Sequence, residues 1–554
     1  MTEPFIKKLG TTDKEIMITH LNKLVDKQYI DGKKSNLWKA IPYKTNKFAG
    51  VMLGNGGGPN PVPLEIRLMR KGLYRVYLGL YSGWDLPRNR IRLSNDLCCQ
   101  RVAVSGNKKE SVFDISCTMY EVFWKEADLT GQSLILESSL VQSTLPSYDA
   151  LAYIRLEPIS KISTPESEIV SHPLFITEDG HGCFKSFSHS RPEDLLEMFE
   201  NNVPKDQNYV QGLLWGNGDA DICNYPTKAG NNWPVSDSFS YSYHNFYHNV
   251  RLWQKKGWDS LKVIRNYAKK RGWEFQVYIR MQAFASPFPF DRVIHSDFFH
   301  AHPECHCLDR KGQRIGRLSY AYPAVQEHML KLIDEIIQYK PDGICLCLIR
   351  GVPLVLYEPI MVEGFKKEYG IDPRKLSETD KRWKDYQAKV ITLFMRKVKK
   401  LLKSHQRLSV MIPGLQRDCE RWGLDVATWV KESIVNDVFP FGQYFDKREV
   451  HRWDIKSLDF KYFNNLENRD KIRLIPMANL ESPSSLSGMR LYLNQGADGY
   501  AAWDGVSGDR HVTDKVIPCD SRRVKKAKSV PIKKWKVLSL SGFRHDKYHY
   551  FEAV

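Results

Sequence analysis

The chain has 554 residues, of which 42% are hydrophobic and 12% are aromatic, including 14 tryptophans and 27 tyrosines. This length predicts two or three domains, and the apolar content excludes a chain that is disordered throughout. The 82 lysines and arginines outnumber the 64 aspartates and glutamates, which gives a formal net charge of +18 and favours anionic partners.

The cysteines and the first residues of the chain bear on its compartment. The eleven cysteines are an odd number, and their spacing, with Cys98 next to Cys99, does not resemble a disulfide framework. The opening residues MTEPFIKKLGTTDKE lack the apolar core of a secretory signal, and no window has the length of a membrane span. We therefore expect a cytoplasmic protein with no membrane partner. A secreted or periplasmic protein whose signal had been removed would show the same pattern.

The first 160 residues predict two different kinds of structure. Residues 1–35 are expected to form a helical extension, because Ile16, Ile18, Leu21 and Leu24 suit one face of a helix around Lys14–Asp26. Residues 36–160 contain short alternating runs separated by turn residues, which predict an all-β domain, a β-sandwich. Its predicted strands are Leu73–Leu80, Ser111–Cys117, Tyr120–Trp124, Ser133–Glu137 and Leu151–Leu156.

Between residues 161 and 520 the pattern changes to apolar strands separated by helical stretches, which is typical of a parallel sheet. Eight such strands predict an α/β fold, a (β/α)8 TIM barrel, whose active site lies in the loops that follow the strands. Residues 521–554 are expected to complete this barrel or to pack on it. The eight predicted strands are Pro173–Ile176, Val210–Leu214, Phe275–Ile279, Gly343–Ile349, Leu408–Ile412, Asp437–Phe439, Ile472–Pro476 and Gly499–Trp503.

Helical periodicity fills the stretches between these strands. In one stretch Val325, Met329 and Leu332 fall at spacings of four and three, which predicts a helix face that packs on a core. The predicted helices are Pro192–Glu200, Asp259–Lys270, Ala324–Tyr339, Trp383–Lys403, Asp425–Ser433, Ser457–Leu466 and Ser484–Asn494.

The residues that follow the predicted strands are rich in acids, aromatics and hydrogen-bonding groups. Glycoside hydrolysis needs two carboxyl groups beside an oxocarbenium-like transition state, with aromatic walls and polar groups for the sugar. Glu358 after strand four and Glu481 after strand seven would face each other across the barrel mouth. We therefore predict Glu358 as proton donor and Glu481 as nucleophile, with Asp504 as the rival for either role. The predicted substrate-binding residues are Asp179, His181, Trp215, Asp221, Tyr225, Arg280, His302, Glu304, Arg350, Tyr357, Asn479 and Trp503.

Five short motifs carry a family resemblance. They are Asp179-Gly180-His181, Tyr225-Pro226, His302-Pro303-Glu304, the strand that runs from Asp342-Gly343-Ile344 to Arg350, and the segment Tyr357–Pro373. With them, the stretch from about residue 176 to residue 504 resembles the uncharacterised bacterial proteins called family 10-like glycosyl hydrolases. The resemblance implies a TIM barrel that acts on a polysaccharide or oligosaccharide. Acids after strands four and seven are also similar to those of the large clan of retaining glycosidases.

The fourth strand departs from the resembled family at one position. Relatives often carry an Asp in the pattern DGIxLD, where this chain has Cys347. If that Asp is catalytic in the relatives, this chain uses other acids, with Glu358 as the nearby substitute, or has lost activity. A catalytically silent carbohydrate-binding protein on the same barrel therefore stays open. Nucleic acid is not the expected partner, because the basic residues form scattered doublets rather than one arm.

The sequence fits a structural zinc site and a serine hydrolase less well. The segment HSDFFHAHPECHC is dense in metal ligands, but its Cys305-x-Cys307 spacing with scattered histidines does not match the paired ligands of structural zinc sites. We expect no metal, and a rim loop whose histidines contact substrate. A serine hydrolase is not indicated, because the chain has no G-x-S-x-G elbow. The expected chemistry is that of paired acids without an organic cofactor.

Arg350 has two predicted roles after strand four. An arginine there often fixes a catalytic carboxylate through a bidentate bond. It would equally bind the sulfate or carboxylate of an acidic sugar, which the positive charge of the chain would help to concentrate. The predicted partner is thus a polysaccharide or oligosaccharide, with sulfated and uronic sugars included.

Overall fold

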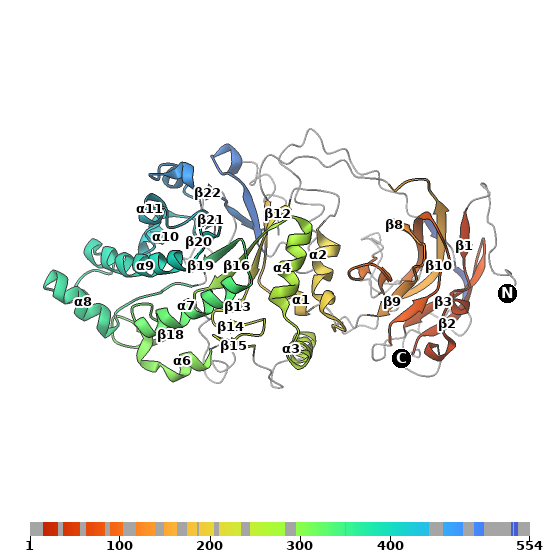
Figure 1. Cartoon of the computed structure of the whole chain (residues 1–554), viewed down its shortest axis with the longest axis horizontal. Helices are drawn as coiled ribbons and strands as arrows, with labels where there is room; N and C mark the ends of the chain where they lie inside the picture. The colour runs from red at the N-terminus through yellow and green to blue at the C-terminus, as the bar shows by residue number, and fades with distance from the viewer. Residues whose placement is uncertain are drawn as a thin grey trace. The chain divides into compact units, whose positions relative to one another are not determined.

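A computed structural model shows two compact units, Met1–Glu166 with Val524–Val554, and Ser167–Arg523 (Figure 1). The residues it describes are 15–30, 37–55, 62–82, 89–102, 118–138, 149–162, 174–185, 188–203, 210–233, 244–282, 295–349, 351–442, 458–479, 492–503, 533–535 and 537–540. Among these residues, no helix combines the length and the apolar character needed to cross a membrane.

The first unit is built from two antiparallel sheets. Its strands are β1 (Ile16–Ile18), β2 (Lys39–Thr45), β3 (Ala49–Asn55), β4 (Leu64–Ile66), β5 (Leu73–Ser82), β6 (Asn89–Leu93), β7 (Gln100–Arg101), β8 (Thr118–Asp128), β9 (Leu134–Ser138), β10 (Asp149–Pro158), β25 (Lys533–Trp535) and β26 (Val537–Leu540). The larger sheet has the order β25-β8-β5-β10-β3-β2-β26, with β1 on β10, and the smaller sheet has the order β4-β9-β6-β7.

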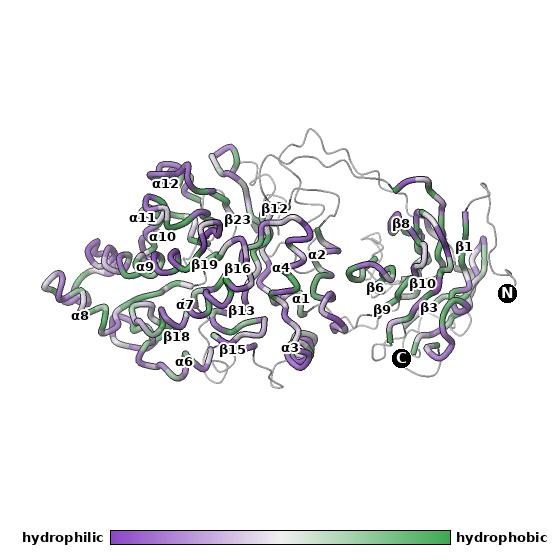
Figure 2. Tube along the Cα trace, in the orientation of Figure 1, coloured by the Kyte–Doolittle hydropathy of each residue, from purple (hydrophilic) through white to green (hydrophobic). Residues whose placement is uncertain are grey.

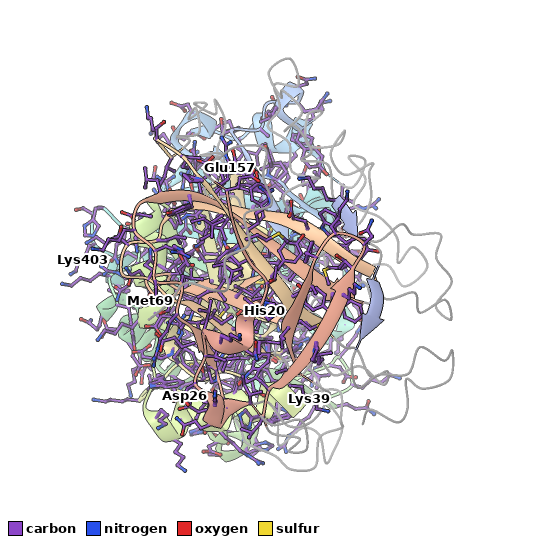
Figure 3. All side chains as sticks on the ribbon, turned by 90° about the vertical axis from the view of Figure 1, so that its right-hand side faces the viewer. His20, Asp26, Lys39, Met69, Glu157 and Lys403 are labelled. Carbon is purple, nitrogen blue, oxygen red and sulfur yellow. The ribbon has the colours of Figure 1, made fainter. Side chains whose placement is uncertain are left out.

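One core joins the two sheets of this unit. Alternate residues of the larger sheet, such as Leu78 and Ile154, pack with Ile91 and Leu136 of the smaller sheet. This alternation is the pattern that predicted an all-β domain. The opposite face of the larger sheet holds a second buried cluster, which includes Met52, Met119 and Tyr153. Figure 3 looks onto this unit and labels Met69, which is 82% exposed. The predicted strand Ser111–Cys117 lies outside the described residues.

The predicted N-terminal helix is wrong. Ile16–Ile18 forms β1, whose residues pair antiparallel with Ile154–Leu156 of β10. Two short 3-10 turns follow β1 in the described residues, η1 (Leu21–Lys23) and η2 (Lys27–Tyr29). The spacing of Ile16, Ile18 and Leu21 fits a strand followed by a turn as well as it fits a helix, so the pairing with β10 decides the conformation.

The expected place of the C-terminal segment is also wrong. Its described strands β25 and β26 pair with β8 and β2, so they extend the larger sheet of the first unit and not the barrel. Trp535 packs its ring edge against Phe48, with the ring centroids 5.5 Å apart. Its indole nitrogen donates a hydrogen bond of 2.8 Å to the hydroxyl oxygen of Tyr153.

The second unit contains a parallel sheet that closes on itself. Its strands are β11 (Leu174–Glu178), β12 (Val210–Gly216), β16 (Glu274–Arg280), β19 (Gly343–Cys347), β20 (Arg407–Pro413), β21 (Asp437–Phe441), β22 (Arg473–Leu474), β23 (Met477–Asn479) and β24 (Tyr500–Trp503). They pair in chain order, and β24 returns to β11. All eight predicted strands are present, with the seventh divided into β22 and β23.

Helices and short excursions connect these strands. The helices are α1 (Gly182–Lys185), η3 (Pro192–Leu196), α2 (Glu197–Asn202), α3 (His244–Lys256), α4 (Ser260–Arg271), α6 (Asp297–Ala301), η5 (Pro303–Cys305), α7 (Pro323–Gln338), α8 (Pro359–Tyr369), η6 (Pro373–Lys375), α9 (Lys381–Leu401), α10 (Gln416–Arg421), α11 (Val426–Lys431), α12 (Phe460–Asn464) and η8 (Arg469–Lys471). The excursions are β13 (Gly218–Asp219), β14 (Ile222–Cys223) and β15 (Asn231–Asn232) after β12, and the hairpin of β17 (His306–Leu308) and β18 (Arg314–Leu318) after β16.

The helices present an apolar face to the sheet and a polar face outward. Figure 2 shows hydrophobic and hydrophilic stretches alternating along α4, α7 and α9. The predicted stripe of α7 is confirmed, because Val325, Met329 and Leu332 are buried. Asp259 caps the start of α4 by accepting from the backbone N–H of Lys262. The predicted helix Ser484–Asn494 lies largely outside the described residues.

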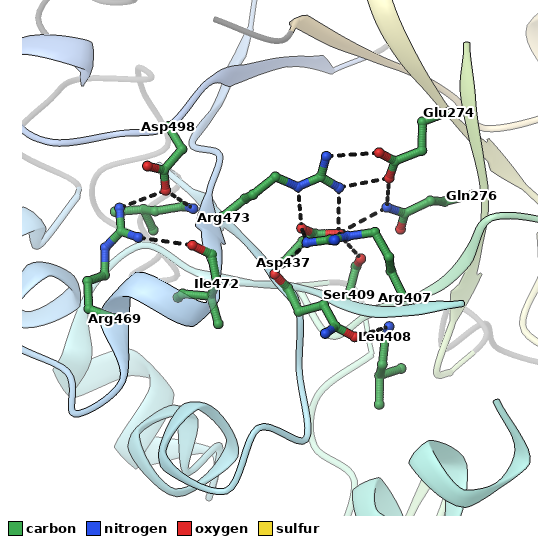
Figure 4. Close-up of polar contacts among 12 residues, drawn as sticks. Glu274, Gln276, Arg407, Leu408, Ser409, Asp437, Arg469, Ile472, Arg473 and Asp498 are labelled. Carbon is green, nitrogen blue, oxygen red and sulfur yellow. Dashed lines mark hydrogen bonds and ion pairs between the residues drawn. The ribbon is translucent and has the colours of Figure 1, made fainter. Parts of the chain in front are cut away.

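A polar network fills the end of the barrel where the strands begin (Figure 4). Asp437 is fully buried and accepts hydrogen bonds from Arg407, Arg473, Ser409 and Gln276. Burial alone would raise the pKa of Asp437, but the hydrogen bonds from both arginines outweigh it and hold the pKa at about 2. Because active sites of such barrels lie at the other end, this network is a structural floor.

Candidate active site

Two aspartates and one arginine meet where the first three strands of the barrel end. Asp179 directly follows β11, Asp219 ends β13 just after β12, and Arg280 is the last residue of β16. Arg280 donates through Nη1 to an oxygen of Asp219 at 3.1 Å and through Nη2 to Asp179. The guanidinium is only 3% exposed, so one buried cation fixes both carboxylates. We call Asp179, Asp219 and Arg280 the rim cluster.

Tyr278 supports the rim cluster from inside the barrel. It lies two residues before Arg280 on β16, so both side chains point to the same face of the strand. Its hydroxyl donates a hydrogen bond to Asp179, and its ring lies 6.3 Å from the ring of Trp503, the last residue of β24. Burial raises the pKa of Tyr278 well above its usual value, and Asp179 adds to the effect. Tyr278 is therefore a neutral hydrogen-bond donor to Asp179.

Burial affects the protonation of Asp219 in the rim cluster. Burial raises the pKa of Asp219, although Arg280 opposes the change. A second arginine, Arg317 of β18, lies close enough to interact electrostatically with Asp219. Burial lowers the pKa of Arg317, and Cys307 and Asp219 oppose that change.

The glycine of the Asp-Gly-His motif turns the chain away from the barrel. Gly180 has a φ of +79°, and a Cβ there would lie 2.1 Å from the side-chain nitrogen of Asn224, so only glycine fits. After this turn the ring of His181 packs against Trp233 and Phe246, at centroid distances of 4.7 and 5.9 Å. Burial lowers the pKa of His181 to about 3, and Arg280 adds to the effect. His181 is thus neutral at physiological pH.

Cys347 ends β19 inside the barrel, in register with Arg280 of β16. It is fully buried among the apolar groups that fill the barrel, including Tyr278, Met411 and Trp503. The position at which the resembled family carries an acid therefore points toward the rim cluster. Here it supplies a thiol in place of a carboxylate.

Glu358, which the sequence predicts as proton donor, is a buried carboxyl group with backbone partners. It is 0% exposed and precedes α8. The backbone N–H of Leu356 donates to its two oxygens at 3.0 and 2.9 Å, and that of Leu308 donates at 3.1 Å. Burial raises the pKa of Glu358, and these backbone donors oppose the rise. Its surroundings are those of a structural carboxyl group that fastens α8 to the β17–β18 hairpin.

Four predicted binding residues pack elsewhere in the second unit. Trp215 contacts Phe199 of α2, and Asp221 accepts from His328 of α7 at 2.8 Å. The ring of Tyr225 meets Tyr339, and that of Tyr357 stacks on Trp383. All four are buried, and these contacts are made with residues that do not belong to the rim cluster. The four residues are Trp215, Asp221, Tyr225 and Tyr357.

The other predicted residues are a surface pair, three residues outside the described part of the chain, and Asn479. His302 and Glu304 form a hydrogen-bonded pair of 2.9 Å on the loop around η5, and both are at least partly exposed. Arg350, Glu481 and Asp504 lie outside the described residues, so their placement stays a prediction. Asn479 ends β23 in register with Trp503, which puts its backbone at the same level of the barrel.

The sequence predicted that Asp179, Arg280 and Trp503 lie at one end of the barrel. It did not predict Asp219, Tyr278 and Arg317 as residues of the site. Strand parity could have found Tyr278, because it precedes Arg280 by two residues on a predicted strand. Asp219 follows β12 in the sequence, as Asp221 does, and no sequence pattern indicates which of the two lies in the site. Arg317 belongs to a hairpin that the sequence did not predict.

Comparisons with known proteins add three distant likenesses. No protein-family model and no curated protein matches the chain. An alpha-galactosidase from Thermus thermophilus is 10% identical, with 84% of this chain and 90% of that chain covered and a TM-score of 0.33. The glycoside hydrolase domain of PelA from Pseudomonas aeruginosa is 11% identical, with 44% and 84% covered and a TM-score of 0.29. A chitinase from Bacteroides thetaiotaomicron is 9% identical, with 60% and 89% covered and a TM-score of 0.32. These structural neighbours are glycoside hydrolases, and at TM-scores below 0.5 they do not assign an activity to this chain.

Proposed function

We propose that the chain is a glycoside hydrolase whose paired carboxyl groups are Asp179 and Asp219. The observation that carries the proposal is the rim cluster, in which one buried guanidinium holds two carboxylates at the carboxyl ends of β11 and β12. Paired carboxyl groups with different environments are what cleavage of a glycosidic bond needs. The cluster also lies at the end of a closed parallel sheet where enzymes of this architecture keep their chemistry.

The two aspartates have distinct proposed roles. Asp219 would act as general acid and give a proton to the glycosidic oxygen as the bond to the leaving sugar breaks, a role that burial favours because it raises the pKa of Asp219. Asp179 accepts hydrogen bonds from Arg280 and Tyr278, which position its carboxylate. It would then attack the anomeric carbon or activate a water molecule. Arg280 offsets the negative charge of Asp179 in both cases.

The proposed substrate is a polysaccharide or oligosaccharide with acidic groups. Arg317 lies beside Asp219 and gives the rim a second cationic side chain. The net charge of +18 would raise the local concentration of a sulfated or uronic polymer.

The test is hydrolysis of a panel of neutral, uronic and sulfated polysaccharides, scored by new reducing ends. On the substrate that the wild-type chain cleaves, Asp179→Asn and Asp219→Asn should each lower turnover by about 10²–10⁴-fold, because a positioned acid or base contributes that much. Asp385→Asn on the exposed face of α9 is the matched control and should keep full activity. Glu481→Gln and Asp504→Asn test the acids predicted from the sequence in the same assay.

The proposal fails if both aspartate variants keep wild-type turnover while their folded structure is intact. If Glu481→Gln alone abolishes turnover, the nucleophile is at strand seven, as the sequence predicted, and Asp179 only positions Arg280. An unchanged binding affinity for the glycan in Asp219→Asn would separate loss of proton transfer from loss of binding.

Cys347 favours a second candidate, a catalytically silent carbohydrate-binding protein. It stands beside Arg280 at the strand end where the resembled family carries an acid. This candidate predicts that the wild-type chain binds a glycan of the panel and releases no reducing ends. It also predicts that Cys347→Asp adds no turnover.

A further inference from the structure

Three metal-ligating groups converge on the loop around η5, outside the rim cluster. The Nδ1 atom of His302, a carboxylate oxygen of Glu304 and the sulfur of Cys305 all lie within 4.8 Å of one another. His302 Nδ1 lies 2.9 Å from Glu304 Oε1, and Cys305 Sγ lies 3.9 Å from the same oxygen. Two ligand atoms of a tetrahedral zinc ion with bond lengths of 2.0–2.3 Å are expected to lie about 3.3–3.7 Å apart. One of the two distances here is shorter than this and the other is longer.

The backbone holds these three residues in place. The N–H of Cys305 donates to the carbonyl of His302 at 3.0 Å and closes the 3-10 turn, which Pro303 opens. The N–H of Ser319, the residue after strand β18, donates to the carbonyl of Cys305 at 2.8 Å and so anchors the turn to the end of the hairpin. The ring of Phe298 packs on His302 with centroids 4.4 Å apart. The ligands thus need only small side-chain rotations to close on an ion.

Burial differs across the cluster in a way that suits an open metal site. Cys305 is 3% exposed, whereas the side chains of His302 and Glu304 are 37% and 63% exposed. An ion could enter from the solvent side and keep one position for water, as three-ligand zinc sites do. The thiolate and the carboxylate would balance the two positive charges of the ion.

We propose that His302, Glu304 and Cys305 form a zinc-binding site. Mixed nitrogen, oxygen and sulfur ligands suit Zn²⁺ better than Mg²⁺ or Ca²⁺, which prefer oxygen. On binding, the Cys305 thiol loses its proton to the buffer, and neutral His302 carries its proton on Nε2 while Nδ1 binds the ion. The hydrogen bonds that both residues make to Glu304 are thereby exchanged for bonds to zinc. The site does not depend on the proposed hydrolase activity.

The test uses the full chain, stripped with a chelator, desalted and titrated with Zn²⁺ in competition with a chromophoric chelator. We expect one Zn²⁺ per chain and the release of about one proton. His302→Ala, Glu304→Ala and Cys305→Ser should each weaken binding at least tenfold. The matched controls His405→Ala and Glu363→Gln alter exposed residues away from the cluster and should bind as the wild type does.

A cobalt titration identifies the sulfur ligand directly. Co²⁺ in the wild-type chain should give a thiolate-to-metal charge-transfer band, and Cys305→Ser should abolish it. Since His302 and Glu304 are accessible to solvent, their variants should fold even if Cys305→Ser does not. The proposal is overturned if no stoichiometric ion binds, or if the ion binds equally well to His302→Ala and Glu304→Ala, which would mean an adventitious ion only.

Discussion

The carboxyl group of Glu358 is held by the backbone on both of its oxygens. Leu356 and Leu308 donate to it from two different segments of chain, and no part of the residue is exposed. A proton donor must reach the glycosidic oxygen of a substrate, which a carboxyl group in this position does not. Glu358 therefore differs from Asp219, whose partner is a side chain at the rim.

Glu358→Gln should lower stability and leave turnover close to the wild-type value. An amide places an N–H₂ group where one carboxylate oxygen now accepts from Leu356 N–H, so two buried donors face each other, at a cost of about 1–3 kcal/mol. Thermal unfolding followed by circular dichroism, together with the reducing-end assay, measures both effects. Glu363→Gln on the exposed face of α8 is the control. A variant with wild-type stability and no turnover would restore Glu358 to the role predicted from the sequence.

At the level of elements, the floor of the barrel ties four strands together through one carboxylate. Asp437 of β21 binds Arg407 of β20 and Arg473 of β22, and Arg473 also bonds Glu274 of β16. The Arg407 contact is 2.5 Å and the Arg473 contact is 2.6 Å. Because the strands come from distant parts of the sequence, this network helps to fix their register where the barrel begins.

Asp437→Asn should destabilise the second unit by about 3 kcal/mol, since removing one partner of a buried ion pair leaves the other charge uncompensated. The wild-type pKa of about 2 lies below the ordinary value of 3.8, so the carboxylate stabilises the fold above pH 4. That contribution is lost as the pH falls from about 4 to about 2. Urea unfolding at pH 7 and pH 3 should show a smaller gap between wild type and variant at the lower pH. A gap that does not change with pH would contradict this account.

The eight barrel strands could be predicted because burial on both faces leaves a continuous apolar run in the sequence. Every residue of β11 and β19 is buried, and each run is too short for a helix that crosses the unit. The run at Ile16–Ile18 has the same local character, and its conformation depends on β10, some 140 residues away. A short apolar run alone does not distinguish these cases.

The candidate site was harder to predict than the strands, because position after a strand does not fix position in space. Between Cys347 and Glu358 the chain leaves the rim and runs along the β17–β18 hairpin. There the N–H of Tyr357 donates to Leu308, and the N–H of Tyr320 donates to Leu354. Asp179 and Arg280 follow their strands directly, within one residue, and the sequence placed them correctly at one end of the barrel.

At the scale of the whole molecule, the chain starts in one compact unit, builds a second and returns to the first. Strands β25 and β26 bring the chain back to the first unit, and the side chain of Trp535 packs against that unit. Its ring lies against Phe48, and its indole nitrogen bonds the Tyr153 hydroxyl, which also donates to Glu121. The stability of the first unit should therefore depend on residues that follow the barrel in the sequence.

Trp535→Ala should lower the unfolding temperature of the first unit and leave that of the barrel unchanged, because compact units usually unfold separately. A fully buried tryptophan costs about 3–5 kcal/mol on truncation, and Trp535 is only partly buried, so we expect about 2–3 kcal/mol. Calorimetry of the full chain should show the shift in one of two transitions. Trp422→Ala, which truncates a half-buried tryptophan of the barrel unit, should shift the other transition and thereby identify each one. If both variants shift the same transition, the two units unfold as one and the return of the chain stabilises the barrel as well.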